Sequence, residues 1–547
     1  MKLVIACLNS KYIHASLSPW CLLAGVREFC KSKVNATVVE STINANLDDF
    51  VKSINKADVY AFSCYIWNIE QTLYVCEKIK QKFGAKIILG GPEVAYRAKD
   101  VLQKYSFVDF VLSGEGEFNL PKLMDAICLS HSFADVDGLT YRVDNTILSN
   151  FEIEYNITPP TPYVQEFFDN LRGRICYIET SRGCPYRCAF CLSGRCSKLR
   201  YFDMDVVKEN ILLLANSGAK TVKFVDRTFN SNPSRANEIL LFIKENYGAK
   251  IPNGVCFHFE IAGDILREDT LTILSCMPYR SVQLEIGMQS FNEETLKLIN
   301  RKTNTQKLIK NIKTLLSFQN MHIHIDLIAG LTGEDLSSFR NSFNIGYNLR
   351  AHMLQMGFLK LLYGADMREN PDKYPCEYSD KPPYEVTETP WLSSDEIVKL
   401  KNCEDALDRL YNSGRFLFTL DYLINDIGIQ PFDLFFDFGN ACSGNKLCLS
   451  LYVQKLYDFY KNKCDKEILR EKIVCDLLSC GAQKDIPDSL KIMDTLYKKV
   501  KAELTNQFGK NFSFALLYKT NKIFVIKHNE ATDLFGRKKG KFLKLTK

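Results

Sequence analysis

Short apolar runs alternate with amphipathic stretches in two long series, and this alternation restricts the chain to an α/β fold built on parallel sheets. In the first series, the expected strands are 3–7, 36–39, 59–64, 86–89 and 107–112. The apolar spacing of residues 70–83 predicts a helix between two of them. Because parallel strands end at the same edge of a sheet, the loops that follow these strands should line a ligand site.

A second series follows the proline-rich stretch 158–162, which can continue neither a helix nor a central strand. Its expected strands are 175–180, 221–225, 255–261, 281–286, 322–328 and 353–361. Helical spacing fills most of the intervals, including 206–214 and 295–318. A run of βα units without a doubly wound return predicts a partial (β/α)6 barrel.

The remaining segments define the domain boundaries. A hairpin pattern occupies 138–149, helical stretches occupy 393–411 and 448–478, and two strand-like runs near the end predict a second hairpin. We therefore predict a Rossmann-like domain over 1–133, a linker with a hairpin over 134–171, the partial barrel over 172–385 and a mostly helical domain over 386–547.

The composition is that of a globular chain of 547 residues, with 46% hydrophobic and 24% charged residues and no apolar stretch long enough for a membrane helix. The net charge of +6 predicts no nucleic-acid partner, and we interpret the basic residues 536–541 as a solvated terminus rather than an RNA contact. The N-terminal run turns polar at Asn9 without a cleavage site, so no signal peptide is expected. Twenty cysteines are too few for a disulfide scaffold and predict reduced thiols in the cytoplasm.

Three cysteines stand on one short loop after the first strand of the second series: Cys184, Cys188 and Cys191. Thiolates separated by three and then two residues can bind three irons of a cubic iron–sulfur cluster and leave the fourth iron open for chemistry. The alternative is a zinc site or a fully ligated electron-transfer cluster with Cys196 as the fourth thiolate. Zinc sites usually pair Cys-x2-Cys with a distant second pair, and none is visible, so we favour the open cluster.

This cysteine spacing, with Phe190 before the last cysteine, resembles the radical S-adenosylmethionine superfamily. Segments 282–290 and 326–334 are similar to its fourth and fifth strands, with Thr332 in place of the usual proline. The resemblance implies a [4Fe-4S] cluster that cleaves S-adenosylmethionine to a 5'-deoxyadenosyl radical, and an electron donor of the flavodoxin or ferredoxin type. It assigns S-adenosylmethionine binding to Phe190, which could equally shield the cluster, and to Gln289. From the residues themselves we add Asp226, which ends the second strand, and Glu285, which we prefer to Glu260 as a carboxylate that needs a partner inside the barrel. Asp226 could instead pair with Arg227.

The first domain lacks Gly-x-Gly-x-x-Gly, so a dinucleotide is not expected. Its loops 90–93 and 114–117, in front of such a barrel, resemble the cobalamin-binding domain of the cobalamin-dependent branch of the superfamily. The resemblance assigns cobalamin binding to Ser63, Gly90, Gly91, Glu93, Gly114 and Glu115. The alternative is an α/β domain with ordinary turn glycines.

His14 is the candidate cobalt ligand, because it lies in the loop after the first strand. Leu17, however, stands where glycine belongs in the family's Asp-x-His-x-x-Gly motif. We therefore expect His14 to cap or hydrogen-bond rather than to bind cobalt.

The run 356–364 and the long helical C-terminal region resemble a subgroup of this branch with a C-terminal domain of unknown function, and this resemblance covers nearly the whole chain. This resemblance carries no substrate with it. The pairing of a cobalamin-type domain with a radical S-adenosylmethionine barrel favours a methyltransferase acting on an unactivated carbon of a small molecule or peptide. One S-adenosylmethionine would methylate reduced cobalamin, and a second would give the radical that takes hydrogen from the substrate. The alternatives are a cyclisation or rearrangement without methyl transfer, and a corrinoid-binding sensor with an inert cluster.

Overall fold

The computed structural model describes residues 1–195, 198–444 and 447–545. The chain divides into two compact units: unit 1 comprises Met1–Leu284, Ile299–Asn304 and Leu359–Val386, and unit 2 comprises Glu285–Leu298, Thr305–Phe358 and Thr387–Lys547. A helix able to cross a membrane is found in neither unit among the described residues.

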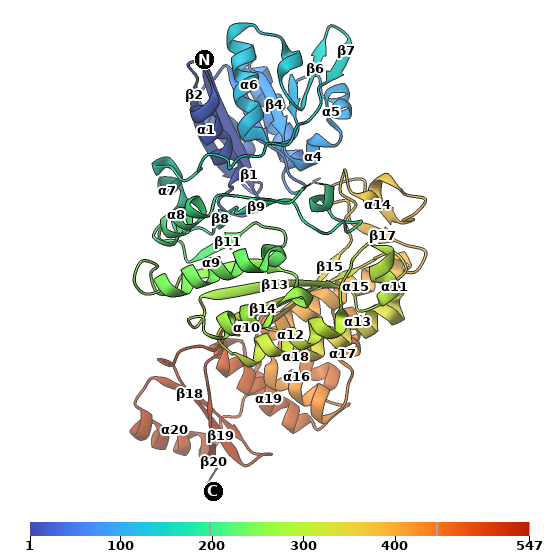
Figure 1. The fold of residues 1–547 in the computed structure, drawn as a ribbon. Coiled ribbons are helices and arrows are strands. Elements are labelled where there is room, and N and C mark those ends of the chain that lie inside the picture. The colour runs from blue at the N-terminus through green and yellow to red at the C-terminus, as the bar shows by residue number, and fades with distance from the viewer. Residues whose placement is uncertain (196–197, 445–446, 546–547) are drawn as a thin grey trace. The chain divides into compact units, whose positions relative to one another are not determined.

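A seven-stranded sheet, in the order β2-β1-β3-β4-β5-β6-β7, forms the N-terminal part of unit 1 (Figure 1). Strands β1 to β5 are parallel, which confirms the predicted Rossmann-like sheet, and β6 and β7 are antiparallel. The hairpin 138–149, which we expected in a linker, therefore forms one edge of this sheet. The strands are β1 (Lys2–Asn9), β2 (Asn35–Thr42), β3 (Val59–Ser63), β4 (Lys86–Gly90), β5 (Phe110–Leu112), β6 (Leu139–Val143) and β7 (Thr146–Ser149).

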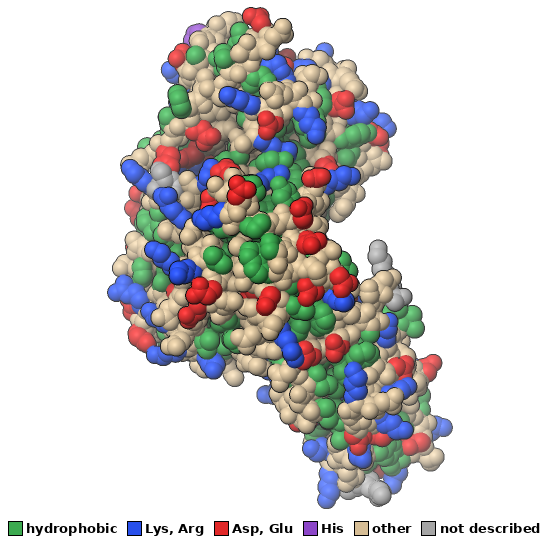
Figure 2. All heavy atoms as spheres, turned by 90° about the vertical axis from the view of Figure 1, so that its right-hand side faces the viewer, with side chains coloured by type: hydrophobic (Ala, Val, Ile, Leu, Met, Phe, Trp, Pro, Cys, Tyr) green, Lys and Arg blue, Asp and Glu red, His purple; other side chains and the backbone are tan. Residues whose placement is uncertain are grey.

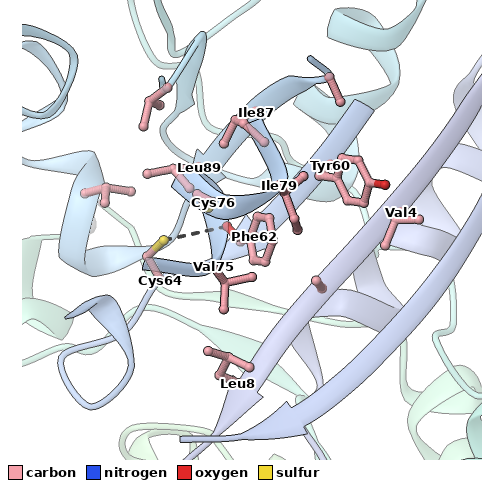
Figure 3. Close-up of a cluster of buried hydrophobic side chains, with 14 of the residues drawn as sticks. Val4, Leu8, Tyr60, Phe62, Cys64, Val75, Cys76, Ile79, Ile87 and Leu89 are labelled. Atoms are coloured by element: carbon pink, nitrogen blue, oxygen red, sulfur yellow. Dashed lines mark hydrogen bonds between the residues drawn. The ribbon is translucent and has the colours of Figure 1, made fainter. Parts of the chain in front are cut away.

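Helices pack on this sheet because its strands are nearly continuous apolar runs, as expected of parallel strands buried on both faces. Figure 3 shows Val75, Cys76 and Ile79 of α3 among side chains of β3 and β4, including Phe62 and Leu89. The helices are α1 (Ser18–Phe29), α2 (Leu47–Ser53), α3 (Ile69–Phe83), α4 (Pro92–Ala95), α5 (Ala98–Lys104) and α6 (Gly116–Leu129).

Helices α1 and α6 pack backbone to backbone at Gly25. A Cβ atom at this position would lie 2.0 Å from the carbonyl oxygen of Glu117, so only glycine permits the contact. This packing fixes the start of α6 and the predicted cobalamin loop that precedes it.

The barrel strands form one sheet in the order β15-β14-β13-β12-β11-β8. Its strands are β8 (Cys176–Ile178), β11 (Thr221–Phe224), β12 (Cys256–Ile261), β13 (Val282–Gln289), β14 (His322–Ala329) and β15 (Met353–Phe358). The intervening helices include α8 (Met204–Ala215), α9 (Pro233–Asn246), α10 (Glu268–Ser275) and α13 (Leu336–Asn348). The predicted partial barrel is therefore confirmed.

One helix predicted for the barrel is wrong. The stretch 295–318 contains two helices, α11 (Glu293–Leu298) and α12 (Thr305–Ser317), separated by a non-helical segment. Asn300 adopts a left-handed conformation there, with φ of 56°. The apolar spacing continues across the break, so periodicity alone does not reveal it.

The C-terminal helices share a core with the barrel elements of unit 2. Phe432 of α17 packs on Phe343 of α13, with ring centroids 5.5 Å apart, and Tyr411 packs on Tyr347 at 4.8 Å. The helices are α15 (Ser394–Leu407), α16 (Leu417–Asp421), α17 (Pro431–Cys442), α18 (Leu449–Tyr460), α19 (Lys466–Ser479) and α20 (Thr495–Phe508). The mostly helical C-terminal region is confirmed.

A small α/β subdomain, residues 491–545, completes unit 2. Strands β18 (Phe512–Leu517), β19 (Lys522–Lys527) and β20 (Lys541–Lys544) form an antiparallel sheet that shares a core with α20. The predicted terminal hairpin is confirmed. The prediction that residues 536–541 form a solvated terminus is wrong for Arg537. This residue is buried and donates to the Asp476 carboxylate at 2.8 Å.

Replacing Arg537 with Met should destabilise unit 2, because Asp476 would stay buried without its cation. Breaking a buried ion pair from one side costs about 3–5 kcal/mol. Burial already raises the pKa of Asp476. A protein becomes more stable as the pH falls when one of its carboxyl groups has a higher pKa in the folded state than in the unfolded state. The loss in free energy of unfolding caused by the substitution should therefore be largest at neutral pH and smaller in acid. Urea denaturation at several pH values measures it, and wild-type stability of the variant at neutral pH would contradict this role.

Candidate functional site

The cysteine loop is closed at its base by a two-stranded ribbon in unit 1. Strand β9 (Ser181–Arg182) pairs with β10 (Arg200–Tyr201) in antiparallel register. Gly183 enters the loop with φ of 94°, and a Cβ atom there would lie 2.7 Å from the carbonyl oxygen of Lys198. The loop therefore carries Cys184, Cys188 and Cys191 on a fixed base, whereas Cys196 lies outside the described residues.

The interior of the loop is anchored by two segments from later in the sequence. The Ala189 amide donates to the carbonyl of Ile299 at 2.9 Å, and the Met367 amide donates to the carbonyl of Ala189 at 3.0 Å. The break between α11 and α12 supplies the first anchor. It also places the Arg301 guanidinium 3.8 Å from the Cys188 sulfur.

These thiols fit an iron–sulfur cluster by their chemistry and their surroundings. All three come from one loop, and Cys188 is buried while the other two are partly exposed. Burial raises the pKa of the Cys188 thiol, and the Arg301 charge acts in the opposite direction. The sequence analysis missed Arg301, because it falls inside an apparently continuous helical pattern.

Asp226 holds the turn before the cysteine loop. Its carboxylate accepts hydrogen bonds from the Thr180 amide at 3.0 Å, from the Thr180 hydroxyl at 2.7 Å and from the Ser181 hydroxyl. Burial raises the pKa of Asp226 to about 6. In this structure Asp226 positions the loop, and Phe190 is half-buried on the loop itself. Contact of either residue with S-adenosylmethionine stays a prediction.

Glu285 and Gln289 lie on the same face of β13, in unit 2, because strand residues alternate between faces. Glu285 meets two residues of β14 that the sequence analysis did not select, His324 and Asp326. His324 Nε2 lies 2.9 Å from an Asp326 carboxylate oxygen, and ligand atoms of all three residues lie within 4.8 Å of one another. Their polar alternation along 322–326 is the signal that could have identified them.

The two barrel motifs of unit 2 are joined by a buried carboxylate. Ser290, next to Gln289, donates to Glu334 at 2.6 Å, and Ser342 donates to the same oxygen at 3.1 Å. Burial raises the pKa of Glu334 to about 7. This bond fixes the end of β13, where Gln289 has a left-handed φ of 68°.

The predicted cobalamin residues of unit 1 lie at one edge of the first sheet. Ser63 pairs with Gly90 across β3 and β4, and Gly90 pairs with Leu112 of β5, which Gly114 follows. A Cβ atom at Gly91 would lie 2.6 Å from the carbonyl oxygen of Cys64. The protein's own backbone therefore requires glycine at this position.

Glu93 binds other parts of unit 1. Its carboxylate lies 2.6 Å from the Arg97 guanidinium and accepts a hydrogen bond from the Tyr384 hydroxyl. The guanidinium groups of Arg97 and Arg368 both lie over the Tyr363 ring, 4.1 and 3.5 Å from its centroid. The loop 90–93 is thereby tied to the segment that follows β15.

Glu115 connects the first sheet to the cysteine loop. Its carboxylate binds Arg200 through bonds of 3.0 and 2.6 Å and also contacts Arg182. Arg182 in turn lies 2.6 Å from Glu117 and 2.8 Å from Glu179. Both arginines belong to the ribbon β9/β10, so the carboxylates of loop 114–117 hold the base of the cysteine loop.

His14 is engaged with the barrel part of unit 1. Its Nδ1 lies 2.6 Å from the Tyr177 hydroxyl of β8, and burial lowers the pKa of its imidazole. The neighbouring Ile13 carbonyl accepts from the Ile175 amide at 2.8 Å. The hydrogen bond agrees with the expected role of His14, and the expectation that His14 does not bind cobalt stays a prediction to be tested.

Exposed apolar side chains follow two of the parallel strands in unit 1. Trp67, after β3, is 45% exposed, and its ring stacks on Tyr65 with centroids 4.5 Å apart. Tyr12 and Ile13, after β1, are 62% and 45% exposed. Exposed aromatic groups at the carboxyl ends of parallel strands provide the contact area that a large flat ligand needs.

Three family models match successive parts of the chain. The B12 binding domain matches residues 5–123, the radical SAM superfamily matches residues 178–344, and a protein family of unknown function, DUF4080, matches residues 372–535. The chain therefore combines a B12 binding domain and a radical S-adenosylmethionine domain, the domain pair of the cobalamin-dependent branch of that superfamily, with this C-terminal domain. The [4Fe-4S] cluster, S-adenosylmethionine and cobalamin are the cofactors of that branch.

Curated relatives match large parts of the chain. The 2-(S-pantetheinyl)-carbapenam-3-carboxylate methyltransferase of Streptantibioticus cattleyicolor is 27% identical over 430 residues, which are 71% of this chain and 62% of the relative. The cobalamin-dependent radical SAM methyltransferase TokK of Streptomyces tokunonensis is 27% identical over 54% of this chain and 46% of its own length. This chain thus spans less than two thirds of either relative.

A solved structure supports the fold over almost the whole chain. The cobalamin-dependent S-adenosylmethionine radical enzyme OxsB, with aqua-cobalamin and S-adenosylmethionine bound, aligns with a TM-score of 0.59. The alignment covers 92% of this chain and 81% of OxsB at 13% identity.

Replacing Arg301 with Gln should shift the midpoint potential of the reconstituted cluster to more negative values, on the order of tens of millivolts. A positive charge beside a cysteine ligand favours the more negative, reduced cluster. Redox titration followed by electron paramagnetic resonance measures the shift, with Arg301→Lys as the charge-preserving control. An unchanged potential in Arg301→Gln would exclude this role.

Replacing His14 with Ala should leave the absorbance spectrum of bound cobalamin unchanged, because Leu17 replaces the glycine of the cobalt-ligand motif and the backbone at His14 is paired with Ile175 of the barrel part. Tyr177→Phe serves as the control that removes the hydrogen-bond partner of His14 and keeps the imidazole. A base-on-like spectrum in the wild type that is lost in His14→Ala would identify His14 as the cobalt ligand.

Proposed function

We propose that this chain is a cobalamin-dependent radical S-adenosylmethionine methyltransferase that acts on an unactivated carbon of a small molecule or peptide. The observation that carries the proposal is the ion network of Glu115, Arg182 and Arg200, which joins the cobalamin-type sheet to the cysteine loop within one unit. Both curated relatives named above are methyltransferases, which supports methyl transfer as the reaction of this chain.

The residues of the chain have distinct tasks in this proposal. Cys184, Cys188 and Cys191 hold three corners of the cluster, and Asp226 and the ribbon β9/β10 fix their loop. When bound, the cofactors supply the electron that cleaves S-adenosylmethionine and the carrier for its methyl group. Glu285, His324 and Asp326 form a polar group in the barrel strands that can orient a substrate by hydrogen bonds.

The proposal extends to the partner and location of the protein. An external one-electron donor of the flavodoxin or ferredoxin type would reduce the cluster. The described cysteines are all free, which supports a reducing, cytoplasmic environment.

Anaerobic reconstitution with iron, sulfide and reductant should give a brown protein that cleaves S-adenosylmethionine to 5'-deoxyadenosine. Cys188→Ala should lose the iron and the cleavage, since the cluster loses one of its three ligands. Cys176→Ala, a buried cysteine outside the loop, is the matched control. A colourless, zinc-loaded wild type would refute the proposal.

Labelled methyl groups separate the proposed reaction from its alternatives. Label from S-adenosylmethionine that appears on the product supports methyl transfer, whereas label found only in methionine indicates a cyclisation or rearrangement. A protein that keeps its cluster and yields no 5'-deoxyadenosine under strong reductant indicates the corrinoid-binding sensor.

A further inference from the structure

The charge of the chain is distributed unevenly. Residues 491–547 contain fourteen Lys and Arg against four Asp and Glu, a net charge of +10. The other 490 residues therefore sum to −4, because the whole chain carries +6. The whole-chain value, which predicted no nucleic-acid partner, averages over these two parts. A short segment with such an excess forms a strong local positive potential.

Seven lysines on the helix and two of the strands of this subdomain are exposed. They lie on α20, β19 and β20, at positions Lys498, Lys499, Lys501, Lys522, Lys527, Lys541 and Lys544. In the described part of the chain, none of these seven forms an ion pair, whereas the neighbouring Lys519 binds Asp465 at 2.9 Å. Lys and Arg side chains are visible at the lower end of the molecule in Figure 2, where the chain ends. We call these seven residues the lysine surface.

The edge of the sheet adds a second feature. Lys522 of β19 stands directly opposite Lys544 of β20, and like charges at such positions repel each other. Between Lys541 and Lys544, Phe542 is 48% exposed, with the Lys522 ammonium 5.6 Å from its ring centroid. This edge of the sheet thus presents two facing positive charges, one on β19 and one on β20, beside an accessible aromatic ring.

We infer that the lysine surface, together with Phe542, binds single-stranded nucleic acid. Phosphates would neutralise the repelling pair Lys522 and Lys544, and an unpaired base would stack on Phe542. Two other kinds of partner fit less well. Protein interfaces are depleted in lysine. Membrane-surface helices present an apolar face outward, whereas α20 buries Val500 and Leu504 in the core of the subdomain.

The inference adds a partner to the proposed function and gives a task to part of the C-terminal domain. It requires no cofactor, so binding can be measured on the full chain without reconstitution. A negative binding result would not affect the methyltransferase proposal, and a negative result for S-adenosylmethionine cleavage would not affect the nucleic-acid inference.

Fluorescence anisotropy with a labelled oligouridylate and an oligothymidylate of equal length, over a range of salt concentrations, tests the inference. The triple variant Lys522→Gln, Lys541→Gln, Lys544→Gln should lose about tenfold or more in affinity at low salt and show a shallower salt dependence. Phe542→Ala should lose about tenfold through stacking and keep the wild-type salt dependence.

The matched control is Lys297→Gln, Lys310→Gln, Lys313→Gln, which removes three exposed lysines from α11 and α12 of the same unit. It should bind like the wild type. Stronger binding of oligouridylate identifies RNA, and equal binding of both strands indicates recognition through the phosphate backbone. Wild-type protein that binds neither strand, a control that loses as much affinity as the triple variant, or binding only to anionic phosphatidylserine vesicles would overturn the inference.

Discussion

Arg182 joins the two cofactor-binding parts of unit 1. Its guanidinium contacts Glu115 and Glu117 from the first sheet and Glu179 from the barrel, while Arg200 shares Glu115. A planar group with several fixed donors suits this arrangement, and a lysine could not reproduce it. Because Arg182 also begins the ribbon that closes the cysteine loop, the position of that loop depends on carboxylates of the first domain.

Several residues selected as ligand contacts instead form the framework of the sites. Gly91 accommodates the backbone of Cys64, Glu93 binds Arg97 and Tyr384, and Asp226 holds Thr180. Such residues make the loops rigid before any ligand arrives, which lowers the entropy lost on binding. Trp67 after β3 and Tyr12 after β1 are aromatic side chains that stay accessible near the first sheet.

Local signals in the sequence were sufficient for much of this architecture. Buried parallel strands, the cysteine spacing and the glycine loops each depend on a few neighbouring residues, and the strands and the barrel agree with the structure. Features set by distant contacts were not predictable. The break that delivers Arg301 coincides with a hydrogen bond from Ala189, and the burial of Arg537 depends on Asp476 of the distant helix α19. The basic subdomain was hidden because net charge is an average over the chain.

The iron content of an Arg182→Met variant, after anaerobic reconstitution beside the wild type, tests the central claim that the cysteine loop is held by the first domain. The account predicts that the variant keeps its secondary structure by circular dichroism and binds far less iron. Arg182→Lys should bind an amount of iron between those of Arg182→Met and the wild type, because an ammonium group cannot bind three carboxylates in the same geometry. Wild-type iron content in Arg182→Met would show that the cysteine loop forms without this network and would contradict the account.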